Sequence, residues 1–140
     1  MFAVLLIIVV CSIVFTDVTR RHISNHQVIA VAVLALLISG FTAFAPLACF
    51  LAIITGLVLF AAGAFAGGDI KLMLAFLPAI QLQWWSLVLM MVAIIGGIMA
   101  LGYLGYGWMT HRMQAVKERG LPYGVPIVIA GFGGVLLSAG

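Results

Sequence analysis

The chain has very little charge and only three acidic residues. Of its 140 residues, 6% are charged and 66% are hydrophobic, whereas an ordinary soluble domain is about one quarter charged. The mean hydropathy is +1.39. This composition excludes a water-soluble globule, because most of its apolar surface would be left in water. We expect a single integral membrane domain, residues 1–140, with no nucleic-acid partner and a core shared with the lipid bilayer.

Patterns that bind metals are also scarce. Cys11 and Cys49 lie far apart in apolar runs and form no C-x-x-C spacing, so we interpret them as small buried hydrophobes. His22 and His26 would share one helical face, but no third ligand accompanies them at a suitable spacing. We interpret them as interfacial polar residues, and we expect neither a metal nor a cofactor.

Six apolar stretches divide the chain. They run over residues 2–16, 28–45, 47–66, 70–80, 84–108 and 122–138. A membrane-spanning helix needs about 20 residues, so we extend the first stretch to residue 21 and begin the fourth at residue 69. The first stretch has no basic region before it and no cleavage site after it, which favours a retained helix over a secretory signal. We predict an all-α membrane protein, a polytopic bundle of six transmembrane helices.

The placement of charge supports six spans. Under this topology the segments around residues 17–27, 66–71 and 109–121 fall on one side of the membrane, and they contain all six basic residues. The positive-inside rule makes that side cytoplasmic. Both termini are therefore predicted to be extracytoplasmic.

Two of the three acids stand at the cytoplasmic ends of predicted spans. A charge at such a position is costly and usually functional, which singles out Asp17 and Asp69. Glu118 lies in the polar loop "THRMQAVKERG", where a solvated ion pair explains it. Asp17 also has a purely structural explanation, because Arg20 and Arg21 follow it at i+3 and i+4 on the same helical face.

A structural explanation exists for Asp69 too. Gly67 and Gly68 would break the preceding helix, and Asp69 would cap the next one by accepting its free amides. The alternative is chemical, since two carboxylates about 3 Å apart in a low-dielectric site share one proton. One can then activate water while the other polarises a peptide carbonyl, as in aspartyl proteases. The glycines would let a locally extended substrate approach the acid.

Three segments resemble the motifs of prepilin peptidases, in the same order. "TDVTRRHISN" (residues 16–25) is similar to their D-x-x-x-R-x-I-P-N segment, and "AGGDIKLM" (66–73) to their G-x-G-D-x-K-L motif. "LPYGVPIVIAG" (121–131) is similar to the signature that opens their last span. The likeness covers essentially the whole chain and is greatest to the short enzymes of tight-adherence (Flp-type) pilus systems.

The resemblance implies an intramembrane aspartyl endopeptidase of the bacterial cytoplasmic membrane. It would remove the short basic leader of type IV prepilins, with pseudopilins as a candidate second class of substrate. Cleavage would take place on the cytoplasmic side, just before the precursor's hydrophobic helix. Asp17 and Asp69 would be the catalytic pair. Gly67, Gly68 and Lys71 are candidate substrate-binding residues. Lys71 would point about 200° away from Asp69 on a regular helix. A side chain that extends its charged end to the membrane–water interface is an equally good explanation of this lysine.

Two positions depart from the pattern of these enzymes. Ser24 stands in place of a proline in the first motif, and Ala66 in place of the first glycine of G-x-G-D. Neither change removes a catalytic group, so both concern the local backbone. The chain also lacks the cysteine-rich cytoplasmic segment of the longer enzymes, and we do not expect it to N-methylate the mature pilin.

Two other classes of function stay open at this point. A small proton- or cation-coupled transporter would carry its acids near mid-membrane, often in a repeated or broken-helix architecture. A non-catalytic pilus assembly subunit would use the acids only to pair with Arg20, Arg21 or Lys71.

Overall fold

The computed structural model describes residues 1–41 and 45–140, and this part of the chain contains helices and no strands. The α-helices are α1 (Phe2–Arg20), α2 (Asn25–Ser39), α3 (Pro46–Ala61), α4 (Gly67–Phe76), α5 (Leu82–Met109), α6 (Met113–Arg119) and α7 (Gly124–Ala139), and the 3-10 turn η1 (Leu77–Ala79) follows α4. The predicted all-α class is confirmed.

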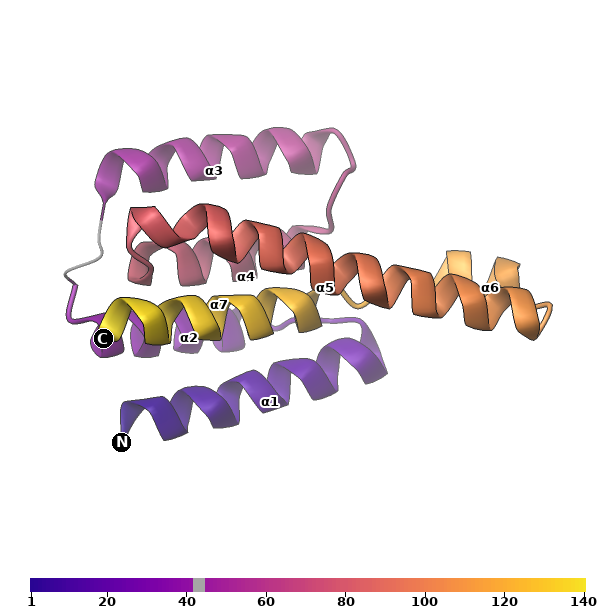
Figure 1. Ribbon diagram of the computed structural model, residues 1–140, viewed down its shortest axis with the longest axis horizontal. Helices are drawn as coiled ribbons and strands as arrows, with labels where there is room; N and C mark the ends of the chain where they lie inside the picture. The colour runs from indigo at the N-terminus through magenta and orange to yellow at the C-terminus, as the bar shows by residue number, and fades with distance from the viewer. Residues whose placement is uncertain (42–44) are drawn as a thin grey trace.

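The helices run back and forth along one direction. The two termini lie at one end of the bundle, and the α1–α2 and α3–α4 connections lie at the other (Figure 1). Helix α7 is the central element, because it packs against α1, α2, α4 and α5 and nine of its 16 residues are buried.

Glycines in α7 allow this crowding. A Cβ on Gly131 would lie 2.6 Å from the ring of Phe76 in α4, and a Cβ on Gly134 would lie 2.6 Å from Cγ2 of Val88 in α5. Helices in lipid gain little from the hydrophobic effect when they associate, so close van der Waals packing has to hold them together. The two glycines therefore belong to the core of the bundle.

The helices differ in length. By length and composition, α1 and α5 can each cross a membrane alone. Helices α6 and α7 are long and apolar enough only if they count as one span, which is bent by 52° between them. Helices α2 and α3 are apolar but shorter. The predicted span 47–66 was too long, because α3 ends at Ala61 and residues 62–66 connect it to α4. The end of the predicted span 28–45 includes residues 42–44, which lie outside the described residues.

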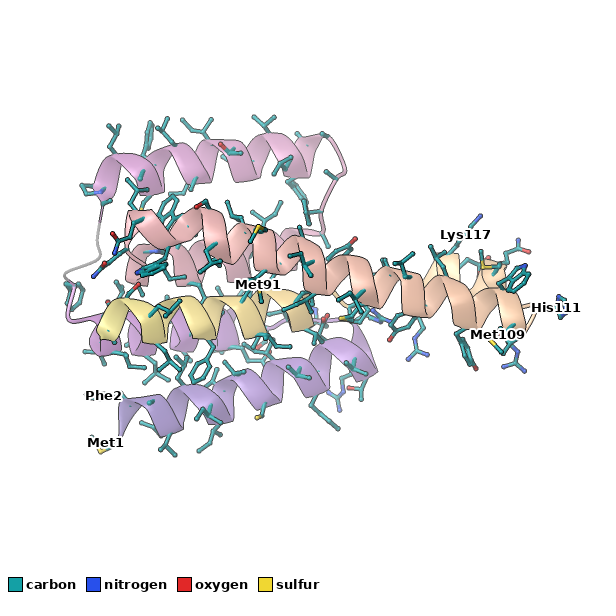
Figure 2. All side chains as sticks on the ribbon, viewed as in Figure 1. Met1, Phe2, Met91, Met109, His111 and Lys117 are labelled. Carbon is teal, nitrogen blue, oxygen red and sulfur yellow. The ribbon has the colours of Figure 1, made fainter. Side chains whose placement is uncertain are left out.

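Helices α5 and α6 form a hairpin that extends beyond the other helices. Met109, His111 and Lys117 lie at its tip, at the opposite end of the molecule from Met1 and Phe2 (Figure 2). The prediction of a polar loop in this region was wrong where α6 forms. Lys117, a basic residue of the hairpin, nevertheless lies away from the termini (Figure 2).

A capping box begins α2. Ser24 is the N-cap: the amide of Gln27 donates to its Oγ at 3.3 Å, and its own amide donates to Oε1 of Gln27 at 3.0 Å. These bonds satisfy amides that the first turn of a helix leaves free. The serine that departs from the prepilin peptidase pattern thus has a defined structural role.

Candidate active site

Asp69 is the third residue of α4. The N-cap is Ala66, in extended backbone with φ −70° and ψ 147°, and Gly67 and Gly68 are the first two helical residues. The expectation that the glycines break the preceding helix and that Asp69 caps the next was wrong, because α3 already ends at Ala61. An alanine adopts the backbone conformation of Ala66 without strain. Replacing the motif's first glycine is therefore harmless to the backbone at this position.

The side chain of Asp69 is buried beside a cavity. It is 8% exposed and stands in the first turn of α4, near the positive end of the helix dipole. Residues of α3, α4, α5 and α7 and of their connections line an open cavity of about 790 Å³, in which most side chains are apolar and Thr55, Asp69 and Tyr123 are polar. The carboxyl group thus borders an apolar space large enough for part of another molecule.

Asp17 is the second buried acid, at 5% exposure. It lies in the last turn of α1 and faces the start of α7, where the backbone amides of Gly124 and Val125 act as donors toward it. The approach is close, because a Cβ on Gly124 would lie 2.6 Å from Oδ2. Oδ2 nevertheless completes no hydrogen bond of good geometry with any residue that the structure describes. A buried polar atom in this condition is costly and is typical of reactive sites.

Arg21 contacts a tyrosine instead of forming a helical pair with Asp17. It follows α1 with φ 53°, in the left-handed region, so the expected i+4 position on the helical face does not exist. Its guanidinium carbon lies 5.8 Å from the ring centroid of Tyr103, a cation–π distance. Within residues 1–41 and 45–140, its Nε and Nη1 have no hydrogen-bond partner. Arg21 still acts on Asp17 electrostatically.

The three motif segments meet at Ile23, which is 9% exposed. A Cβ on Gly68 would lie 3.7 Å from Cβ of Ile23, and a Cβ on Gly124 would lie 3.2 Å from its Cδ1. Ile23 therefore packs between the start of α4 and the start of α7. This packing brings Asp17 and Asp69 together as electrostatic neighbours. When two buried carboxyl groups interact electrostatically, the negative charge on one disfavours ionisation of the other. The arrangement is therefore compatible with a pair that shares one proton.

Lys71 is exposed and does not line the cavity. Its Nζ donates a hydrogen bond of 3.4 Å to Oδ1 of Asn25, the first residue of α2. The bond joins the start of α4 to the start of α2. Lys71 thus contacts the first motif directly, a contact that helical spacing alone does not predict.

The open sides of the two glycines face the protein itself. A Cβ on Gly67 would lie 3.2 Å from the ring of Phe60, and the neighbour of Gly68 is Ile23, as described above. Phe60 is 55% exposed, so its ring is not locked in the core. The ring of Phe60 covers this side of Gly67.

Within the described residues, no group of three His, Cys, Asp or Glu side chains could hold a metal ion. His22 follows the end of α1 and His26 lies in α2, so the expected shared helical face does not exist. The interpretation of both cysteines as buried was wrong, because Cys11 is exposed and Cys49 is only partly buried.

Tyr123 and Gly124 belong to the site, although neither of them was assigned a role there from the sequence. Tyr123 lines the cavity with Asp69, and its ring meets Phe65 edge-on with a centroid distance of 5.8 Å. Gly124 leaves the room that the Asp17 carboxyl group occupies. The available signal was the "PYG" sequence at the start of the last span, where a helix has no local need for glycine.

Residues 4–101 match the model of the Type IV leader peptidase family. The matched region holds both Asp17 and Asp69 and most of α5, and it covers more than half of the chain. No curated protein and no solved structure matched the chain.

Proposed function

Because the chain belongs to the type IV leader peptidase family, we propose that it is an aspartic-type intramembrane endopeptidase that cleaves the short basic leader of type IV or Flp-type prepilins. Asp17 and Asp69 are the catalytic pair. One observation supports this most directly: two of only three acids in the chain are buried and are electrostatic neighbours. They come from separate motifs, and no local interaction requires them to meet.

The proposed reaction uses the two carboxyl groups in opposite protonation states. The ionised group takes a proton from water, and the water oxygen forms a bond to the carbonyl carbon of the leader's last peptide bond. The protonated group donates its proton to the carbonyl oxygen. The tetrahedral intermediate then collapses: the carboxyl group that took the proton from water passes it to the amide nitrogen, the C–N bond breaks and the amine leaves. The other carboxylate takes a proton back from a hydroxyl group of the intermediate, which becomes the carboxylic acid product. General acid and base catalysis of this kind contributes on the order of 10²- to 10⁴-fold for each group, and it needs neither a metal nor a cofactor.

We assign substrate contacts to Gly67, Gly68 and Lys71. Helical peptides hide their carbonyls, so the scissile segment has to be extended before water can attack it. Gly67 would lie against that segment after the exposed ring of Phe60 moves aside. The ammonium group of Lys71 would exchange its bond with Asn25 for a carbonyl of the substrate.

The proposed topology has six spans, both termini outside, and the catalytic pair near the cytoplasmic face of the bacterial inner membrane. The common position of the two termini and the alternating direction of the helices support it (Figure 1). So does the presence of all six basic residues in the segments of the opposite side. The short helices α2 and α3 would require local thinning of the bilayer or flanking residues that reach the interface.

A cation-coupled transporter and an assembly subunit are the alternatives. Asp17 lies in the last turn of α1 and Asp69 in the first turn of α4, whereas a transporter is expected to hold its acids at the midplane. An assembly subunit would need the acids only as partners for basic residues. Within the described residues, Oδ2 of Asp17 forms no hydrogen bond with a basic side chain, which does not suit that role.

Co-expression with a candidate prepilin tests the proposal. Loss of the leader is followed by mass for the wild type, Asp17→Asn, Asp69→Asn and Glu118→Gln. The last variant is the matched control, because it neutralises the third acid at an exposed position of α6. We expect cleavage by the wild type and by Glu118→Gln, with or without a metal chelator, and none by the Asn variants. Full cleavage by either Asn variant would rule out the catalytic pair.

A further inference from the structure

One flank of the bundle carries a long apolar groove, the cavity of about 790 Å³ that borders Asp69. Helix α3 packs against α4 and η1, whereas α5 packs against α6 and α7. The helices α3 and α5 therefore form opposite walls of the groove. Leu51 on one wall and Leu89 on the other are 56% and 43% exposed, so the groove opens to the surroundings of the bundle. For a membrane protein those surroundings are lipid.

The groove follows the direction of the helices. Its lining extends along α3 from Ala48 to Leu59 and along α5 from Leu82 to Gly97. At a rise of 1.5 Å per residue these stretches are about 16 Å and 22 Å long. This is at least half of the hydrocarbon thickness of a bilayer, which is about 30 Å. The length suits three to four turns of a helix.

Two polar side chains of the groove, Asp69 and Tyr123, lie at the end that the proposed topology makes cytoplasmic, whereas Thr55 lies midway along α3. Asp69 lies in the first turn of α4 and Tyr123 immediately precedes α7. Most of the remaining lining is aliphatic or aromatic. An apolar helix in this groove would therefore have one end beside a buried carboxyl group and the rest of its length against hydrocarbon side chains.

We propose that this groove receives the hydrophobic helix of the precursor, which enters sideways from the lipid between α3 and α5. The inference rests on the proposed function and adds the route and the docking surface. The bond to be cut directly precedes that helix, so seating the helix between the two walls brings the bond to Asp69. The leader then emerges on the cytoplasmic side. A lipid tail would fill the same apolar space but offers no peptide bond to the carboxyl pair.

Blocking the groove provides the first test. Ala93 lines the groove and its neighbour Ile94 does not, although both are exposed on α5. In bilayers, we expect Ala93→Trp to lower the kcat/KM for full-length precursor about tenfold, since an indole obstructs close packing. Ile94→Trp, the matched control, should keep the wild-type rate. Equal wild-type rates for both variants would overturn the proposal.

Cross-linking provides the second test and does not depend on the folding of the tryptophan variants. A photo-reactive benzoylphenylalanine is placed at Leu51, in the groove, or at Ile53, outside it on the same helix, in the Asp69→Asn background. We expect adducts with the precursor from Leu51 and few from Ile53. Adducts with lipid alone would make the groove a lipid site and overturn the inference.

The two proposals fail in different ways. A wild type that cleaves no precursor contradicts the peptidase function, and the inference falls with it. A wild type that cleaves, together with unaffected groove variants and no precursor adduct at Leu51, contradicts the docking groove alone.

Discussion

Gly124 and Asp17 are packed so closely that a Cβ on the glycine would stand 2.6 Å from Oδ2 and 2.9 Å from Cγ of the aspartate. The acid belongs to the first helix and the glycine to the last. The space for the carboxyl group therefore exists only because residue 124 has no side chain. Both residues lie in segments that resemble motifs of prepilin peptidases, and this contact gives a physical reason for their association.

We expect Gly124→Ala to reduce prepilin cleavage about tenfold or more, because the new methyl group must displace the carboxyl group or Ile23. Overpacking at such a site costs about 1–3 kcal/mol. Gly133→Ala is the matched control on the same helix, since a Cβ there meets no atom of the described residues within 4 Å. Cleavage rate and thermal unfolding are measured for both. A Gly124→Ala enzyme with wild-type rate and stability would contradict the contact.

The effects of removing the two acids should not add. If Asp17 and Asp69 act as one unit, the double variant Asp17→Asn/Asp69→Asn should be no slower than either single variant. Groups that act together in catalysis show this behaviour. Single-turnover rates of leader removal make the comparison. A double variant that is slower by the product of the two single effects would indicate independent roles.

Ser24→Ala should lower stability without changing the chemistry. It removes the Oγ that accepts from the amide of Gln27, and loss of such a cap costs about 0.5–2 kcal/mol. Ser24→Thr keeps an acceptor and is the control. Thermal unfolding in detergent and the kcat of each variant are compared. An unchanged unfolding temperature in Ser24→Ala would show that the capping box contributes nothing measurable.

Lys71→Met tests the proposed substrate contact. If the ammonium group binds a carbonyl of the substrate, the KM should rise about three- to tenfold, because Lys71 is exposed and a typical hydrogen bond contributes about 0.5–1.5 kcal/mol net. Asn25→Ala breaks the observed bond to Lys71 but keeps the ammonium group, so its KM should stay close to the wild-type value. A rise of similar size in both variants would make Lys71 a structural residue only.

Local features were predicted well, and long-range ones were not. The cores of all six apolar stretches form helices, and α5 matches its predicted span within two residues. The errors lie where local signals are ambiguous. Gly67 and Gly68 read as helix breakers but begin α4, because Ala66 ahead of them takes the capping position. The segment at 113–119 reads as a polar loop but forms a short helix.

The sequence by itself determined that this is a membrane protein of helices, and it singled out Asp17 and Asp69 because charge is rare and costly in such a chain. Only the tertiary structure decided that Ile23 packs between α4 and α7, that Gly124 makes room for Asp17, and that a groove runs along the bundle to Asp69. Composition and helical periodicity depend on neighbours within a few residues. These three features depend on residues tens of positions apart in the sequence, and their geometry follows from how the helices pack against one another.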